Sequence, residues 1–193
     1  IVHLSTAQAL AAVARARRGG LPVHAETCPH YLLLDDSEYE RPGFEAAKVV
    51  MSPPLRDPSH LAPLWRGLAS DDLQVVSTDH CPFNYAERPH GLRCSKQQGR
   101  ESFTRIPNGA PGIETRLPLM FDAAVLQRGL SINRFVAVTA TNPARLFGLF
   151  PRKGTIAIGS DADLVLFDPI ERWTIRAAEH HSRADYSLYE GRE

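Results

Sequence analysis

The chain has 193 residues, with 22 basic and 22 acidic side chains and a formal net charge of zero. This balance excludes an electrostatic binder of nucleic acid or of a membrane surface as the first hypothesis. Hydrophobic residues make up 43% and charged residues 23%, which is typical of a globular protein and excludes a disordered or fibrous chain. The apolar runs are far shorter than the roughly 20 residues that cross a bilayer, so we expect no membrane span and no signal peptide.

The three cysteines, Cys28, Cys81 and Cys94, form an odd set without a CxxC spacing. Neither a disulfide framework nor a cysteine zinc site is therefore predicted, and we expect a reducing, cytoplasmic setting. The sequence starts without an initiator Met, directly in the apolar segment 1–4, so we expect it to begin inside a domain.

The first 80 residues alternate between short apolar runs and helical patterns. Ser5 and Gln8 have the spacing of a capping box, and Gly19 with Gly20 ends the helical stretch that follows. In chain order we predict a strand at 1–4, a helix at 5–18, strands at 21–25 and 48–51, a helix at 59–68 and a strand at 73–76. This alternation predicts parallel β/α units.

Residues 80–111 lack clear periodicity, so we predict one long loop there. Loops of that length in a compact domain are usually functional or disordered. Apolar residues then recur at helical spacing, which predicts helices at 113–127 and 131–140 and a short helix from Asn142.

The pattern changes after Gly148. Two β runs surround a Gly-Ser-Asp turn within residues 153–167, which predicts a hairpin. We therefore divide the chain into two domains, at 1–147 and 148–193.

Polar side chains stand where the predicted strands end. His3 ends the first strand, Ser52 ends the third, and Asp79 with His80 ends the fourth. In parallel β/α proteins the loops at the carboxyl ends of the strands build the pocket. An imidazole nitrogen and a carboxylate oxygen both suit zinc, so His3 and Asp79 are candidates for a shared metal site. On the residues alone, a hydrogen-bonded structural His and a helix-capping Asp are favoured over the metal site.

Several neighbouring groups have simpler interpretations. We expect His80 to hydrogen-bond rather than to bind metal, and Cys81 to be a small buried side chain. The pair His180 and His181 lies in a polar tail, where a solvated or interface pair is favoured over a ligand pair.

Two further residues are candidates for contact with a polar ligand. Ser52 has no evident His partner, so a substrate-binding hydroxyl or backbone group is favoured over a nucleophile. Asn108 and Gly109 close the long loop, either as a turn or as backbone groups that contact the ligand.

Six segments occur in the order found in dihydropyrimidinases, also called D-hydantoinases, which are cyclic amidohydrolases. They are VHLS at 2–5, ETCPHYL at 26–32, MSPPLR at 51–56, TDHCPF at 78–83, IPNGAPGIE at 106–114 and GTIAIGSDADLVLF at 154–167. The chain resembles this family over essentially its whole length.

The resemblance implies an α/β fold, the C-terminal part of a (β/α)8 TIM-like barrel of the amidohydrolase type, followed by part of a small β-sandwich domain. Residues 1–147 would belong to the barrel, and residues 148–193 to the sandwich and the start of the C-terminal tail. It also implies two zinc ions per subunit, bridged by a carboxylated Lys that lies outside this chain.

By the same resemblance, His3 is a zinc ligand on the sixth barrel strand, and Asp79 is the zinc-binding aspartate on the eighth. Asp79 is also the catalytic residue, which takes the proton of the attacking hydroxide and passes it to the departing ring nitrogen. Ser52 and Asn108 match the positions whose backbone groups hold the ring of the substrate. The implied reaction opens a dihydropyrimidine or hydantoin to an N-carbamoyl amino acid, a step of pyrimidine catabolism.

The family's HxH pair, its bridging Lys and one further His ligand precede the part that this chain matches. A barrel needs about 250 residues, so we expect the chain alone neither to close the barrel nor to catalyse the reaction. The implied partners are a small cyclic diamide and further copies of the full-length protein in a homotetramer, with no nucleic acid and no membrane. Residues 84–104 are longer than is usual in the family and border the pocket, which leaves the preferred substrate open.

Two alternatives remain. Allantoinase and dihydroorotase share the barrel, and the ETCPHYL motif at 26–32 is at least as typical of allantoinase. A non-catalytic scaffold of the same family would have lost zinc ligands, whereas His3 and Asp79 are both retained.

Overall fold

The computed structural model describes residues 1–87 and 95–193. Two short strands, β1 (Glu26–Thr27) and β2 (Val75–Val76), pair in parallel. On the other side of β1, the backbone N–H of Leu4 donates to Glu26 O at 2.8 Å, and that of Glu26 donates to Ile1 O at 3.0 Å. Residues 1–4, β1 and β2 therefore form three neighbouring parallel segments, which confirms the parallel arrangement predicted for the first 80 residues.

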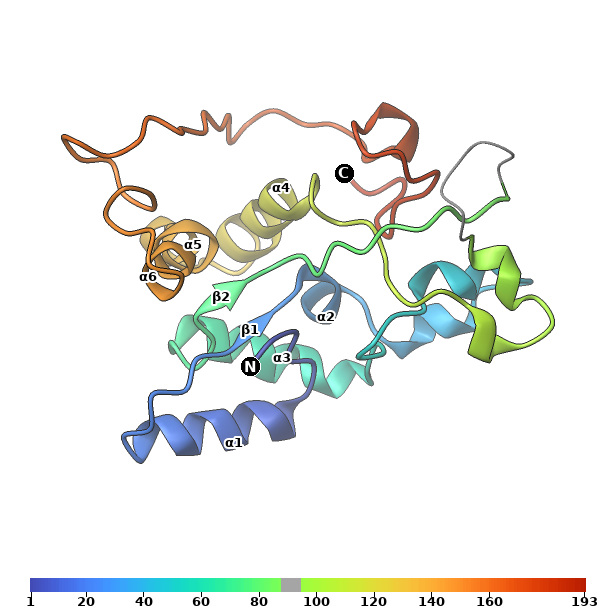
Figure 1. The fold of residues 1–193 in the computed structure, drawn as a ribbon, viewed down its shortest axis with the longest axis horizontal. Coiled ribbons are helices and arrows are strands. Elements are labelled where there is room, and N and C mark those ends of the chain that lie inside the picture. The colour runs from blue at the N-terminus through green and yellow to red at the C-terminus, as the bar shows by residue number, and fades with distance from the viewer. Residues whose placement is uncertain (88–94) are drawn as a thin grey trace.

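In the part of the chain that the structure describes, six α-helices and several 3-10 or π turns surround these segments. The helices are α1 (Ala7–Arg18), α2 (Pro29–Leu33), α3 (Leu61–Ala69), α4 (Arg116–Met120), α5 (Ile132–Val136) and α6 (Asn142–Leu146). The 3-10 turns are η1 (Asp36–Glu40), η2 (Glu45–Val49), η3 (Pro58–His60), η4 (Lys96–Gly99), η5 (Phe103–Arg105) and η8 (Ala177–Glu179). The π turns are η6 (Phe121–Leu126) and η7 (Ala137–Thr141). In Figure 1, α1 and α3 lie below the two strands and α4 to α6 lie above them. Within the described residues, no helix is both long and apolar enough to span a membrane.

Helix α1 begins one residue later than its capping box predicts. Thr6, rather than Ser5, is the N-cap, and its side chain accepts the N–H of Ala9 at 3.2 Å. The buried side of α1 packs on α3 at a close contact, because a Cβ on Gly67 would lie 2.7 Å from Leu10 Cδ2. A glycine on α3 thus lets the two helices approach each other.

The predicted strand at 48–51 is wrong. The 3-10 turn η2 runs to Val49, and the carbonyl of Val50 bonds to the side chain of Lys96 and to the N–H of Gly109 instead of to a neighbouring strand. Since a buried carbonyl needs a donor from some source, these two contacts replace the ladder of a sheet.

The helices that follow the long loop are held against β2 by polar side chains. Arg116 Nη1 donates to Val76 O at 3.0 Å, Arg134 Nη2 to Leu73 O at 2.7 Å, and Asn142 Nδ2 to Gln74 O at 2.9 Å. The predicted helices are present, although α4 starts at Arg116 and α5, η7 and α6 follow one another without a break.

The predicted hairpin within 153–167 is also wrong. No strand is assigned there, and Ile158 and Leu166 are fully exposed, at 109% and 101% of their reference areas. An isolated hairpin is at best marginally stable, and most apolar side chains of this segment are exposed, although the ring of Phe167 packs on that of Phe121 with centroids 4.5 Å apart. The segment crosses the top of the molecule as an extended chain (Figure 1).

The C-terminal tail, by contrast, is partly buried. Tyr186, Leu188 and Tyr189 are each only 4% exposed. The carboxylate of Asp185 accepts the N–H groups of Tyr85 at 2.6 Å and Ala86 at 3.0 Å, so the tail packs on the segment that follows β2.

Candidate functional site

His3 and Asp79 emerge at the same edge of the parallel segments. His3 precedes the last residue of the first segment, and Asp79 follows β2, with β1 between them. Neighbouring strands lie about 4.8 Å apart, so the first segment and β2, which carry these residues, are about two strand spacings apart across the sheet. The structure therefore places the imidazole and the carboxylate at one edge, where their side chains can converge.

Both residues have a left-handed backbone. The φ angle is 40° at His3 and 46° at Asp79, and Asp71 at 67° is the other non-glycine residue with positive φ in the described part of the chain. Such a conformation is costly for residues with a side chain and is concentrated at functional sites. The two predicted ligands thus share an uncommon backbone state.

His30 is a third titratable group at this edge. It follows β1 in the first turn of α2, it is 5% exposed, and its Nε2 has no hydrogen-bond partner among the described residues. Burial, with a smaller contribution from His3, lowers the pKa of His30 to about 3. The ring is therefore neutral at neutral pH, with a nitrogen free to accept a hydrogen bond or to bind a metal, depending on the tautomer.

His80 has a clear hydrogen-bonding role. Its Nδ1 accepts the N–H groups of Gly112 at 3.1 Å and Ile113 at 3.3 Å, and burial lowers its pKa. The neutral ring thus fixes the loop that follows Asn108. The expectation for Cys81 is wrong, because its side chain is exposed; the buried thiol is Cys28, whose pKa burial raises to about 12.

Ser52 and Asn108 meet at the surface. Ser52 Oγ donates to Asn108 Oδ1 at 3.2 Å, and both residues are exposed. The Asn108 loop also lies beside the segment that follows Asp79, because Cys81 N–H donates to Ala110 O at 3.1 Å. Three of the four predicted site residues, Ser52, Asp79 and Asn108, therefore lie on three segments, with the Asn108 loop in contact with the other two.

Gly109 is required for this contact between loops. Its φ is +138°, and a Cβ there would lie 2.6 Å from Cys81 O and 2.7 Å from Cys81 Cβ. No other residue type fits without moving one of the two backbones.

Among the described residues, side chains with suitable donor atoms for a metal ion are present at this edge, but too few of them lie together to hold one. A nitrogen from His3 and an oxygen from Asp79 are donors that suit zinc, which usually takes three or four protein ligands. Across residues 1–87 and 95–193, no group of three or more His, Cys, Asp or Glu side chains is placed to hold a metal ion. A complete site would need ligands from outside this part of the protein.

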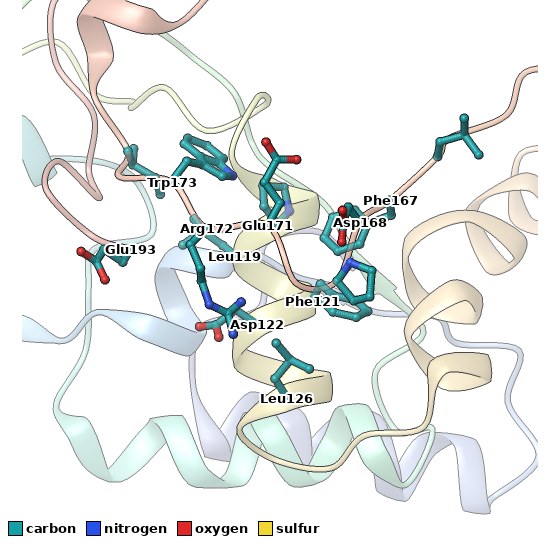
Figure 2. Close-up of a pocket in the computed structure, with 14 residues that line it drawn as sticks. Leu119, Phe121, Asp122, Leu126, Phe167, Asp168, Glu171, Arg172, Trp173 and Glu193 are labelled. Atoms are coloured by element: carbon teal, nitrogen blue, oxygen red, sulfur yellow. The ribbon is translucent and has the colours of Figure 1, made fainter.

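A cavity is present elsewhere in the described residues. It is a groove of about 330 Å³ between α4 with η6 and the extended segment that contains Phe167 and Trp173 (Figure 2). His3, Ser52, Asp79 and Asn108 do not line it. Since its lining lacks convergent ligands of the kind found at the strand edge, we place the candidate site at the edge.

The C-terminal tail borders that edge. The carboxylate of Glu114 accepts the N–H groups of His181 at 3.0 Å and Ser182 at 3.2 Å and contacts His181 Nδ1 at 2.8 Å. Burial raises the pKa of Glu114, but the hydrogen bonds from His181 and Ser182 outweigh it and lower the pKa to about 2. The pair His180 and His181 is thus part of a tail contact, with His181 exposed as expected.

Two residues at the site were missed by reasoning from the sequence. His30 lies directly after β1, so the rule that pocket residues follow strands could have selected it. Lys96 is fully buried beneath the Ser52 and Asn108 loops. No sequence signal marks it, since a lysine in an aperiodic loop normally points to solvent.

Comparison with known proteins gives a consistent result. A family model described as "Amidohydrolase family" matches residues 2–187. The chain is 50% identical over 192 residues to the D-hydantoinase of Streptomyces coelicolor, covering 100% of this chain and 39% of that protein. It is 47% identical over 191 residues to the D-hydantoinase of Geobacillus stearothermophilus, covering 99% of this chain and 39% of that protein.

Solved structures agree with the sequence matches. The crystal structure of dihydropyrimidinase from Brevibacillus agri superposes with a TM-score of 0.93 at 48% identity, covering 98% of this chain and 40% of that chain. The L-hydantoinase (dihydropyrimidinase) from Arthrobacter aurescens superposes with a TM-score of 0.85 at 31% identity, covering 99% and 40%. The chain thus spans about 40% of the length of these relatives.

Proposed function

Because this chain belongs to the amidohydrolase family, we propose that it supplies the C-terminal part of a full-length enzyme that hydrolyses a cyclic amide. The proposal is supported by the contact between Ser52 and Asn108 next to the segment that follows Asp79, within a chain that is similar throughout to hydantoinases and dihydropyrimidinase. The substrate class is a dihydropyrimidine or a hydantoin, and the product is an N-carbamoyl amino acid.

We propose His3 and Asp79 as this chain's ligands to two zinc ions per subunit. The remaining ligands, including a carboxylated Lys, would come from the part of the full-length protein outside this chain. When bound, zinc supplies a water whose pKa is lowered toward neutrality. The imidazole and carboxylate at the edge fit that donor chemistry.

Asp79 is the proposed catalytic residue. Its carboxylate accepts the proton of the attacking water and delivers it to the ring nitrogen that departs when the amide C–N bond breaks. Its exposed position and left-handed backbone support this role, because the side chain faces the space at the end of β2 rather than the core.

Ser52 and Asn108 are the proposed substrate-binding residues. Their backbone N–H and C=O groups would pair with the N–H and C=O groups of the cyclic diamide. The side-chain bond between them supports the assignment, since it holds the two loops together without substrate.

Allantoinase-like hydrolysis is the second candidate. It is favoured by the Glu-Thr-Cys-Pro-His-Tyr-Leu motif, whose His30 is buried beside His3. Assembly into a homotetramer, a cytoplasmic location, and the division into a barrel part at 1–147 and a sandwich part at 148–193 stay predictions.

The decisive experiment is ring opening of 5,6-dihydrouracil by the full-length protein with zinc, followed by loss of ultraviolet absorbance. The 193-residue chain serves as the control, and a 5-substituted hydantoin, allantoin and dihydroorotate are assayed in parallel. Activity on the first two substrates by the full-length protein alone supports the proposal. If the folded, zinc-loaded protein opens only allantoin or dihydroorotate, the result supports an allantoinase-like or dihydroorotase-like enzyme. If it opens none of these rings, the result supports a non-catalytic scaffold.

A further inference from the structure

Lys96 has an unusual environment for a cation. Its side chain is fully buried, at 0% exposure. Its Nζ donates to three backbone carbonyls, at 2.8 Å to Val50 O, 2.6 Å to Pro107 O and 2.8 Å to Gly109 O. An ammonium group has three N–H donors, so all of them are used. No salt bridge joins Lys96 to a carboxylate anywhere in residues 1–87 or 95–193.

The three carbonyls belong to residues that are close in sequence to the proposed substrate-binding residues. Pro107 and Gly109 are the two neighbours of Asn108, and Val50 lies two residues before Ser52. Gly109 N–H also donates to Val50 O at 3.1 Å, so this carbonyl receives both the ammonium and the opposite loop. The cation therefore joins the two loops directly beneath the exposed pair Ser52 and Asn108.

Core packing alone does not explain a lysine here. Burial of a charge is costly, and burial lowers the pKa of Lys96 to about 8. Even a buried ion pair can often be replaced by apolar side chains of similar volume without loss of stability, so a charge at this position needs a reason beyond packing. Three carbonyl oxygens repel one another, and the ammonium of Lys96 holds them close together because it donates to all three. A methionine at this position has no donor and could not do this.

Building on the proposed function, we propose that Lys96 is a positioning residue for the substrate: its ammonium holds the loops of Ser52 and Asn108 so that their backbone groups match a cyclic diamide. Lys96 does not touch the ring itself. Its effect is on binding and orientation, because the loops are ordered before the substrate arrives, and preorganisation lowers the free-energy cost of binding.

The test compares Lys96→Met, Lys96→Arg and a control, Lys153→Met, in the full-length protein. Lys153 forms exposed ion pairs with Asp161 and Asp163, away from both loops. We expect Lys96→Met to raise KM for 5,6-dihydrouracil roughly 10- to 100-fold, because three carbonyls lose their donor, with a smaller change in kcat and no loss of bound zinc. Lys96→Arg should recover part of the change in KM, and Lys153→Met should leave KM unchanged.

A second measurement does not depend on activity. Amide hydrogen exchange should be at least about tenfold faster at Gly109 in Lys96→Met, since the bond from Gly109 N–H to Val50 O loses its support. If Lys96→Met does not fold, Lys96→Gln is used for both readouts.

The outcomes separate the two proposals. A lower melting temperature with unchanged KM and unchanged exchange at Gly109 would show that Lys96 is only structural, and would overturn the inference. If the unmodified, zinc-loaded protein opens no ring, the proposed function fails, and exchange at Gly109 still decides whether Lys96 holds the loops.

Discussion

The side chains of Ser52 and Asn108 are joined by a hydrogen bond of 3.2 Å, although the residues are 56 positions apart in the chain. Each residue lies within an irregular segment, and neither residue belongs to a strand. The two segments are instead held together by other contacts. Lys96 donates to Gly109 O, and Gly109 packs closely against Cys81.

Asp79→Asn in the full-length protein should lower kcat by at least about 10²-fold, the usual scale for loss of a general base. Asparagine keeps the shape and tolerates the left-handed backbone but cannot accept the proton. Steady-state assay of 5,6-dihydrouracil opening measures the effect. Asp71→Asn is the matched control, because Asp71 also has positive φ but lies in the turn before β2. Near-normal turnover of Asp79→Asn would remove this residue from the proton-transfer role.

His3→Gln should reduce zinc affinity at least about tenfold, since loss even of groups that only support a ligand costs that much. Competition with a chelator, read by metal analysis of the full-length protein, measures it. His24→Gln is the control, because His24 is exposed and lies before β1, at the other end of the strand. Equal zinc retention in both variants would contradict the assignment of His3 as a ligand.

Gly109→Ala should raise KM by roughly 5- to 100-fold, because the added Cβ collides with the backbone of Cys81 and strains a left-handed residue. Gly129→Ala is the control: its φ is +68° and a Cβ there meets nothing within 4 Å. Steady-state kinetics of the two variants are compared. A rise in KM in Gly109→Ala alone indicates displacement of the Asn108 loop, whereas a rise in both indicates the general free-energy cost of a side chain at positive φ. Similar KM values in both would show that this loop does not contact the substrate.

Docking of the C-terminal tail should depend on pH through Glu114. Its folded pKa is lowered to about 2 from an ordinary value of 4.5, so its contribution is complete above about pH 4.5 and is lost as pH falls toward 2. Protection of the His181 and Ser182 amides from hydrogen exchange should decrease over that range. At pH 6, Glu114→Gln should speed their exchange roughly two- to fivefold, the scale of a partly exposed charged contact.

Glu179→Gln is the control for this prediction, because Glu179 lies in the same tail, is largely exposed, and has only a 3.9 Å contact with Arg176. Exchange at His181 and Ser182 that is independent of pH between 4.5 and 2 would mean that the tail is held by its buried tyrosines rather than by the carboxylate.

The sequence alone determined the local features of this protein. Periodicity and capping predicted α1, α3 and the helices after residue 115, because these signals depend on residues within one or two turns. The order of motifs predicted the family that the comparisons confirmed. The position of His3 and Asp79 after apolar runs was enough to select both as candidates, since parallel strands end at a common edge.

Only the tertiary structure decided the features that depend on distant partners. Residues 48–51 have strand propensity, yet Val50 O is taken by Lys96 and Gly109, so no ladder forms. Most apolar side chains of the segment 153–167 are exposed, and no strand forms there. From the sequence, Lys96 is expected to be a surface lysine. In the structure it is buried, because three carbonyls from two loops accept hydrogen bonds from it. In each case the deciding energy comes from a partner far along the chain, which local sequence does not encode.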